Sequence, residues 1–160
     1  MRMSIHAVGR MKAGPERDLS ARYIERLAKA GPPLGLEFAG IREIAESRAG
    51  TAEQRRGEEG QPLLRAVEDG AFLVLLDETG KSIGSEDFAR RLAVLRDDGQ
   101  RDIVFAIGGP DGHDPALRQK AGLLLSFGRM TWPHQLARIL LAEQLYRACT
   151  ILSGHPYHRA

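Results

Sequence analysis

The chain has 160 residues, of which 42% are hydrophobic and 28% are charged, and its formal net charge at pH 7 is +2. A chain of this length forms one core, so we expect a single domain spanning residues 1–160. The composition excludes a disordered protein. No run approaches the roughly 18 consecutive apolar residues that cross a membrane, so we expect no membrane partner.

The cysteine content and the first residues indicate the compartment. Cys149 is the only cysteine, so an internal disulfide is excluded, as in proteins of reducing compartments. We expect its thiol to pack as a small apolar group. Residues 1–5 carry no apolar signal segment, and a cytoplasmic protein is therefore expected.

Residues 1–41 predict a strand, a helix and a second strand. Residues 4–8 form the first strand, and residues 34–41 alternate in the manner of a half-buried strand. Residues 15–30 begin with a proline, which suits a first helical turn. The predicted apolar face of this helix consists of Leu19, Tyr23, Ile24 and Leu27.

Residues 42–70 are charged and show the weakest pattern. Gly57, Gly60 and Pro62 interrupt their helical spacing. Glycine costs about 1 kcal/mol and proline about 3 kcal/mol in a helix interior. We therefore expect a broken or mobile helix here.

Residues 71–112 predict two buried strands. Residues 71–76 are apolar throughout, which is typical of a central parallel strand. After a turn, Ser85 and the two acidic residues behind it predict the start of a helix. Residues 102–107 form the next buried strand, which runs directly into the glycine-rich residues 108–112.

The remaining residues predict a short helix, a third short strand at 123–127 and a long helix at 133–149. Asp114 and Pro115 are suited to the N-cap and first residue of the short helix. The residues of the long helix that we expect to face the core are Leu136, Ile139, Leu140, Leu145 and Tyr146. A polar tail closes the chain.

Strands that alternate with helices predict an α/β fold with a mostly parallel sheet flanked by helices. In such sheets, ligands bind beyond the carboxyl ends of the strands. The relevant ends lie at 76–77, 107–109 and 126–127. We therefore expect a ligand site built from the loops that follow them.

Two of these loops have unusual composition. Residues 108–112 are glycine-rich, but they match neither the dinucleotide-binding spacing nor the phosphate-binding loop, so a tight turn and a ligand loop are equally compatible with them. Residues 127–134 contain the only tryptophan of the chain, with a methionine and an arginine. Exposing such side chains is costly unless they pack on a neighbouring element, a second subunit or a ligand ring.

The C-terminal part is basic. Residues 113–160 carry six Lys or Arg against two Asp or Glu, together with four of the five histidines, whereas residues 1–112 carry 17 against 19. This asymmetry favours an anionic partner, with chance clustering as the alternative. The tail 155–159 is either a docked structural segment or a functional one, because His, Tyr and Arg stack on bases, pair with phosphate and transfer protons. A metal site at His155 and His158 is disfavoured, since no Cys or acidic cluster supports it.

Four motifs in one order resemble the ribosomal RNA large subunit methyltransferase H family of the SPOUT superfamily. They are Ile-Gly-Gly-Pro-Asp-Gly at 107–112, Leu-Ser-Phe at 125–127 with Met-Thr-Trp-Pro-His-Gln at 130–135, Ala-Glu-Gln-Leu-Tyr-Arg-Ala at 142–148, and His-Pro-Tyr-His-Arg at 155–159. The resemblance covers essentially the whole chain. It is sharp over 71–160 and weak over 1–70.

The resemblance implies S-adenosylmethionine as methyl donor and N3 of a pseudouridine in 23S rRNA of the assembled ribosome as acceptor. It also implies a homodimer with a C-terminal trefoil knot, and it implies no DNA partner. The cofactor-binding residues that it implies are Leu76, Gly108, Gly109, Phe127, Gly128, Arg129, Met130, Thr131 and Trp132. At Gly128 and Arg129 the loop departs from the family pattern, so only the backbone of Arg129 receives a role.

The implied catalytic residues are Tyr157, His158, Arg147 and His155. The N3 proton must leave during transfer, and a histidine near neutrality is suited to accept it. Our hypothesis places Tyr157 and His158 near the base, with Arg147 as electrostatic support. Three rival hypotheses stay open: another RNA substrate such as transfer RNA, a non-catalytic ribosome-binding factor, and a nucleotide-binding protein.

Overall fold

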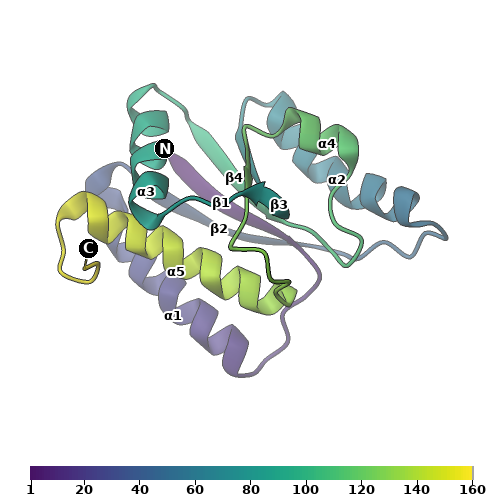
Figure 1. Cartoon of the computed structure of the whole chain (residues 1–160), viewed down its shortest axis with the longest axis horizontal. Coiled ribbons are helices and arrows are strands. Elements are labelled where there is room, and N and C mark those ends of the chain that lie inside the picture. The colour runs from purple at the N-terminus through teal and green to yellow at the C-terminus, as the bar shows by residue number, and fades with distance from the viewer. Residues whose placement is uncertain (160) are drawn as a thin grey trace.

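The computed structural model describes residues 1–159, which form a five-stranded parallel sheet covered by helices on both faces (Figure 1). The strands are β1 (Arg2–Val8), β2 (Glu37–Ile44), β3 (Phe72–Lys81), β4 (Asp102–Ile107) and β5 (Leu123–Leu125), in the order β2-β1-β4-β3-β5. The helices are α1 (Pro15–Ala30), α2 (Ala52–Glu68), α3 (Ser85–Asp97), α4 (Pro115–Lys120) and α5 (His134–Ser153), with a 3-10 turn η1 (Pro32–Leu34). The predicted α/β class is confirmed. The implied knot stays a prediction.

Two apolar layers attach the helices to the sheet. On one face, Ile5 of β1 and Phe105 of β4 pack in a core with α1, α3 and α5. On the other face, Leu63 of α2 and Leu117 of α4 pack in a core with Leu75 of β3. Burying each of these side chains contributes about 1.5–3 kcal/mol. Cover on both faces explains why the central strands are apolar along their length.

The second strand begins later than predicted. Residues 32–34 form η1, and β2 runs from Glu37 to Ile44 instead of occupying 34–41. Pro32 and Pro33 lack the N–H groups that a strand donates. Gly35 then adopts a φ of 72°, and this left-handed conformation turns the chain into the strand.

The helix predicted to be broken is continuous from Ala52 to Glu68. It packs against α4, and Leu63 of α2 and Leu117 of α4 lie in the same apolar core. The hydroxyl of its N-cap Thr51 accepts a hydrogen bond from the N–H of Gln54. Tertiary packing and this cap therefore offset the unfavourable propensity of the sequence.

The later helices follow the predicted signals with two differences. Asp114 caps α4 as predicted, accepting from the N–H of Ala116 at 2.8 Å. The cap of α3 is Gly84, not Ser85. Ser85 lies inside the first turn and donates its hydroxyl hydrogen to Gln144 of α5 at 2.7 Å, so it joins two helices instead of capping one.

Two residues predicted to face the core are exposed. Leu19 of α1 is 37% exposed and Leu136 of α5 is 39% exposed. The two helices pack against each other along their length, so both leucines belong to one layer of the molecule (Figure 1). Within residues 1–159, no helix is long and apolar enough to cross a membrane.

Candidate active site

A cavity of about 390 Å³ lies where β3, β4 and β5 end. Its walls come from the loops that follow these strands, at the edge of the sheet where ligands bind in parallel α/β folds. The implied cofactor residues that line it are Leu76, Gly108, Gly109, Phe127, Gly128, Met130, Thr131 and Trp132. Arg129 is exposed and is not part of the lining. The volume lies within the range of small-molecule sites, about 300–1,000 Å³.

The glycine loop 108–112 forms a tight wall of this cavity. The N–H of Gly112 donates to the carbonyl of Gly109 at 3.0 Å, and Gly112 has a φ of 78°. A Cβ atom at Gly109 would stand 3.0 Å from Val8, and one at Gly108 would stand 3.2 Å from the ring of His113. The loop is therefore closed in by its neighbours, and glycine is required where the backbone approaches them.

The opposite wall is the loop that joins β5 to α5. The hydroxyl oxygen of Ser126 lies 2.9 Å from the carbonyl oxygen of Gly128 and 3.2 Å from that of Glu78, so its single hydrogen is shared between these two acceptors. The hydroxyl of Thr131 donates to the carboxylate of Glu78 at 3.1 Å. These bonds tie the loop to the end of β3, so two walls of the cavity are held as one unit.

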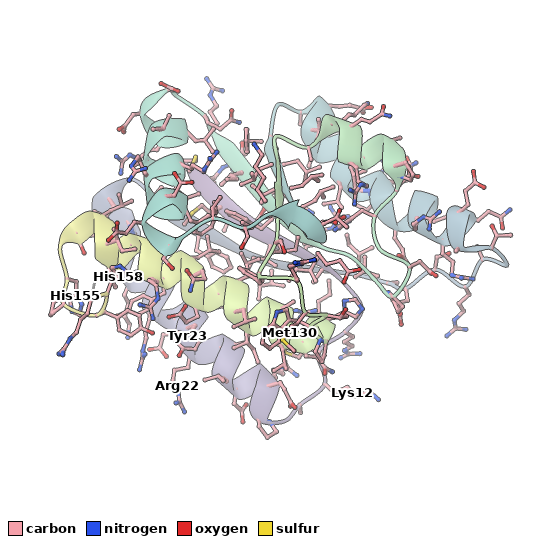
Figure 2. The ribbon with its side chains drawn as sticks, viewed as in Figure 1. Lys12, Arg22, Tyr23, Met130, His155 and His158 are labelled. Atoms are coloured by element: carbon pink, nitrogen blue, oxygen red, sulfur yellow. The ribbon has the colours of Figure 1, made fainter. Side chains whose placement is uncertain are left out.

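The same loop carries two large apolar side chains that line the cavity and are also exposed to solvent. Met130 is 78% exposed and Trp132 is 42% exposed. Figure 2 shows Met130 at the N-terminal end of α5. Exposed side chains of this kind mark a contact surface for a ligand or a partner.

The sequence hypothesis missed a polar cluster on the cavity wall. Asp77 accepts hydrogen bonds from the N–H of Thr79 at 2.9 Å and from its hydroxyl at 2.6 Å, and it forms an ion pair with Arg118. Burial opposes its ionisation, but these hydrogen bonds, with the Arg118 guanidinium beside it, hold the pKa of Asp77 below its usual range. The signal for Asp77 was its position directly after an apolar strand.

His113 is a second cavity residue that sequence reasoning did not select. Its Nε2 atom lies 3.1 Å from the carbonyl oxygen of Leu76. Burial lowers the pKa of His113, so the ring is neutral at pH 7 and donates its Nε2 hydrogen to this carbonyl. The signal for His113 was its position directly after the glycine loop.

The predicted catalytic residues of the tail gather around one carboxylate. Glu143 of α5 accepts from the hydroxyl of Tyr157 at 2.9 Å and from two nitrogens of Arg147 at 2.7 and 3.0 Å. The Arg147 guanidinium also lies 4.7 Å from the centre of the Tyr157 ring. Burial and the Glu143 carboxylate raise the pKa of Tyr157 well above its ordinary value, so its phenol is a hydrogen-bond donor and not a base.

The two tail histidines differ in their surroundings. Nδ1 of His158 lies 3.3 Å from Arg147, and its Nε2 lies 3.6 Å from the carboxylate of Glu86 on α3. His155 is exposed, and its Nδ1 accepts from the N–H of Tyr157 at 3.2 Å. Within residues 1–159, no group of three or more His, Cys, Asp or Glu is arranged to hold a metal ion.

The tail cluster and the cavity lie at opposite ends of α5. Figure 2 shows Met130 at one end of this helix and His155 and His158 at the other. A helix of 20 residues is about 30 Å long. One protomer therefore does not bring its predicted catalytic residues to its own predicted cofactor residues.

A second cavity of about 290 Å³ lies between them. It shares Leu125, Phe127 and Trp132 with the first cavity and includes Ser85 and Gln144. The side chain of Gln144 donates to Glu143 at 2.8 Å, so hydrogen bonds link this cavity to the tail cluster.

Comparison with known proteins gives consistent relatives over the full chain. A family model described as "Predicted SPOUT methyltransferase" matches residues 1–158. The chain is 66% identical to the ribosomal RNA large subunit methyltransferase H of Brucella anthropi and 62% identical to that of Mesorhizobium japonicum, in each case over 160 residues and 100% of both chains. It is 61% identical to that of Brucella abortus over 169 residues and 100% of both chains. The crystal structure of the A. aeolicus TrmH/SpoU tRNA modifying enzyme matches with a TM-score of 0.49 at 14% identity, over 95% of this chain and 76% of that chain.

Proposed function

The chain belongs to the SPOUT methyltransferase family, and from this premise we propose that it transfers a methyl group from S-adenosylmethionine to N3 of a pseudouridine in 23S rRNA of the assembled ribosome. The observation that carries the proposal is the cavity at the ends of β3, β4 and β5, which is lined by the residues implied to bind the cofactor. The relatives named as ribosomal RNA large subunit methyltransferase H support the choice of RNA. A ribosomal substrate is compatible with a cytoplasmic location.

The cavity suits S-adenosylmethionine in size and chemistry. Leu76, Phe127 and Trp132 supply apolar surface for a ring, and the carboxylate of Glu78 suits a cationic ligand. The glycine loop allows the ligand to approach its backbone closely. S-adenosylmethionine supplies an electrophilic methyl group there, and the contribution of the chain is to align the acceptor with it.

The acceptor side of the reaction belongs to the tail. As the methyl group bonds to N3, the N3–H bond breaks, so a group must accept a proton and the developing charge on the base must be stabilised. Tyr157 donates its hydroxyl hydrogen to Glu143 and so is not a base. We therefore assign to His158 the role of accepting the N3 proton, and to its neighbour Arg147 the role of stabilising the developing negative charge on the base. Tyr157 shares the Glu143 carboxylate with Arg147, and through Arg147 it also helps to position His158. The exposed His155 and Arg159 are available to RNA.

In a homodimer, the predicted catalytic residues of one protomer can lie next to the predicted cofactor residues of its partner. Leu19, Leu136, Trp132 and Met130 leave apolar surface on the layer of α1, α5 and the adjoining loop. A two-fold axis across this layer brings opposite ends of α5 together, so the tail of one protomer meets the cavity of its partner. Each site then contains residues of both chains.

The experiment is a methyl-transfer assay on ribosomes that lack the modification. Purified protein and labelled S-adenosylmethionine are incubated with these ribosomes and, in parallel, with a free RNA hairpin and with transfer RNA. The label is mapped by mass spectrometry. We expect one pseudouridine to be labelled at N3 in ribosomes, and no label in the free hairpin. A net charge of +2 provides only weak electrostatic binding to free RNA.

Other outcomes separate the alternatives. Label in transfer RNA would replace the proposed substrate and retain the reaction. Binding of S-adenosylhomocysteine without labelling of any RNA would support the proposed cofactor and contradict the proposed RNA substrate. Ribosome binding without cofactor binding would support a non-catalytic factor, and binding of NAD or ATP would support a nucleotide-binding protein.

A further inference from the structure

The outer side of the glycine loop is held by α2. The guanidinium of Arg55 donates to both carboxylate oxygens of Asp111, through Nε at 2.7 Å and a terminal nitrogen at 3.1 Å. Its third nitrogen donates to the carbonyl of Ala49 at 3.0 Å. One side chain therefore connects α2, the segment before it and the cavity wall, with the fork geometry that only arginine provides.

A buried carboxylate supports the loop from behind. Glu59 of α2 is 5% exposed, and a Cβ atom at Gly109 would stand 3.1 Å from its Oε2 atom. Its Oε1 atom accepts from the N–H of Ser47 at 3.0 Å, and the Ser47 hydroxyl donates to Glu58. A buried carboxyl group is costly unless its oxygens are hydrogen-bonded. The Oε2 atom, which faces Gly109, has no hydrogen-bond partner within residues 1–159, so Glu59 is bonded to segment 45–51 and packs against the underside of the glycine loop.

Neither contact reaches the chemistry. Arg55 and Glu59 do not line the cavity, whereas Gly109 and Asp111 do. Arg55 and Glu59 can therefore affect ligand affinity only by changing the conformation of the glycine loop.

The geometry points to Arg55 and Glu59 as positioning residues that hold the glycine loop in its cofactor-binding shape, so that cofactor affinity is coupled to the packing of α2 and segment 45–51. This inference rests on the proposed function, because the ligand is S-adenosylmethionine or its product S-adenosylhomocysteine. Coupling is reciprocal. Loosening α2 weakens cofactor binding, and bound cofactor tightens α2.

The first test measures the affinity for S-adenosylhomocysteine by calorimetry in full-length Arg55→Ala and Arg55→Lys proteins. The matched control is Arg2→Ala, since Arg2 forms the same forked pair with Asp102 at 2.8 and 3.0 Å, at the start of β1 and far from the cavity. We expect Kd to rise about tenfold in Arg55→Ala, within the usual range of coupling. Arg55→Lys recovers part of this loss, because lysine keeps the charge without the fork. In turnover, KM for S-adenosylmethionine rises and KM for ribosomes does not.

The second test needs no variant. Hydrogen exchange of residues 45–68 is compared with and without S-adenosylhomocysteine in the wild-type protein, and we expect slower exchange with the ligand. Protection confined to the cavity loops, or an unchanged Kd in a folded Arg55→Ala protein, would overturn the inference while the proposed function stands. A wild-type protein that binds no S-adenosylhomocysteine would instead overturn the proposed function.

Discussion

Gly109 occupies a position with no room for a methyl group. A Cβ atom there would stand 3.0 Å from Val8 on one side and 3.1 Å from the buried carboxylate of Glu59 on the other. Both neighbours resist displacement, because Val8 belongs to β1 and the other carboxylate oxygen of Glu59, Oε1, accepts from Ser47. We therefore expect the glycine loop to shift toward the cavity when this residue is enlarged.

We predict that Gly109→Ala weakens S-adenosylhomocysteine binding by at least tenfold, roughly 1.4 kcal/mol, and lowers the melting temperature slightly. Calorimetry and thermal unfolding measure the two effects. Gly84→Ala is the control for affinity, since a Cβ atom at Gly84 meets nothing within 4 Å. Wild-type affinity in Gly109→Ala would show that the loop does not contact the cofactor.

The tail side chains carry the second residue-scale prediction. We expect His158→Ala to lower kcat by roughly 10²–10⁴-fold, as loss of a proton acceptor does. Tyr157→Phe removes the phenol bond to Glu143 and lowers kcat less. Both are measured at saturating cofactor and ribosomes, with the exposed Ser153→Ala as control. Near-normal turnover in both tail variants would show the assignment to be wrong.

His113 predicts a pH dependence of stability. Burial lowers its pKa from the ordinary value of 6.5, so below that pH the unfolded chain binds more protons than the folded chain. The free energy of unfolding therefore falls as the pH decreases from about 7.5 to about 5.5. His6, whose pKa burial also lowers, contributes in the same direction.

Urea unfolding at those two pH values, in wild type and in His113→Gln, separates the contributions. The glutamine retains a donor for the Leu76 carbonyl but does not titrate, so its loss of stability is smaller and reflects the contribution of His6. Equal losses in both proteins would show that His113 is protonated as easily in the folded state as in the unfolded state.

At the scale of helices and strands, the sequence predicted the features that depend on residues close together in the chain, such as helix starts and buried strands. The bounds of α1 and the cap at Asp114 follow from proline and aspartate at helix starts, and both are confirmed. The apolar runs located β3 and β4, and with them the cavity at their ends. The extent of α2 was not predictable, because its packing against α4, which is distant in sequence, offsets the cost of Gly57, Gly60 and Pro62. Arg147, Tyr157 and His158 were predicted from the sequence, but Glu143 as the acceptor shared by Arg147 and Tyr157 was not, since residues 143 and 157 meet only after α5 and the tail have folded back.

The proline inside α2 gives the element-scale prediction. Pro62 has no N–H to donate within the helix, and its ring crowds the preceding turn. Pro62→Ala should therefore stabilise the protein by about 1–3 kcal/mol, part of the gain being offset by a more flexible unfolded chain. Urea unfolding measures the change, with Gln61→Ala, an exposed neighbour, as control. A destabilised Pro62→Ala would show that the proline ring packs usefully against its surroundings.

At the scale of the whole molecule, α5 separates what the reaction must bring together. The cavity adjoins the N-terminal end of α5, Glu143 lies at its middle, and Arg147 and the tail lie toward its C-terminal end. In the proposed dimer, one protomer supplies the cofactor cavity and the other supplies the tail. A monomer would then bind cofactor without turning over, even with every side chain intact.

Mixing two impaired variants at a limiting cofactor concentration tests this arrangement directly. At that concentration Gly109→Ala leaves its cavity mostly empty and retains the tail, whereas His158→Ala disables the tail and retains the cavity. In a shared site, a mixed dimer has one site with an intact cavity and an intact partner tail. Equal mixing after subunit exchange makes half the dimers mixed, so we expect about a quarter of wild-type activity to return. Each variant alone, and the mixture before exchange, are the controls. If each protomer used its own tail, every site would contain one damaged part and no activity would return at any mixing ratio.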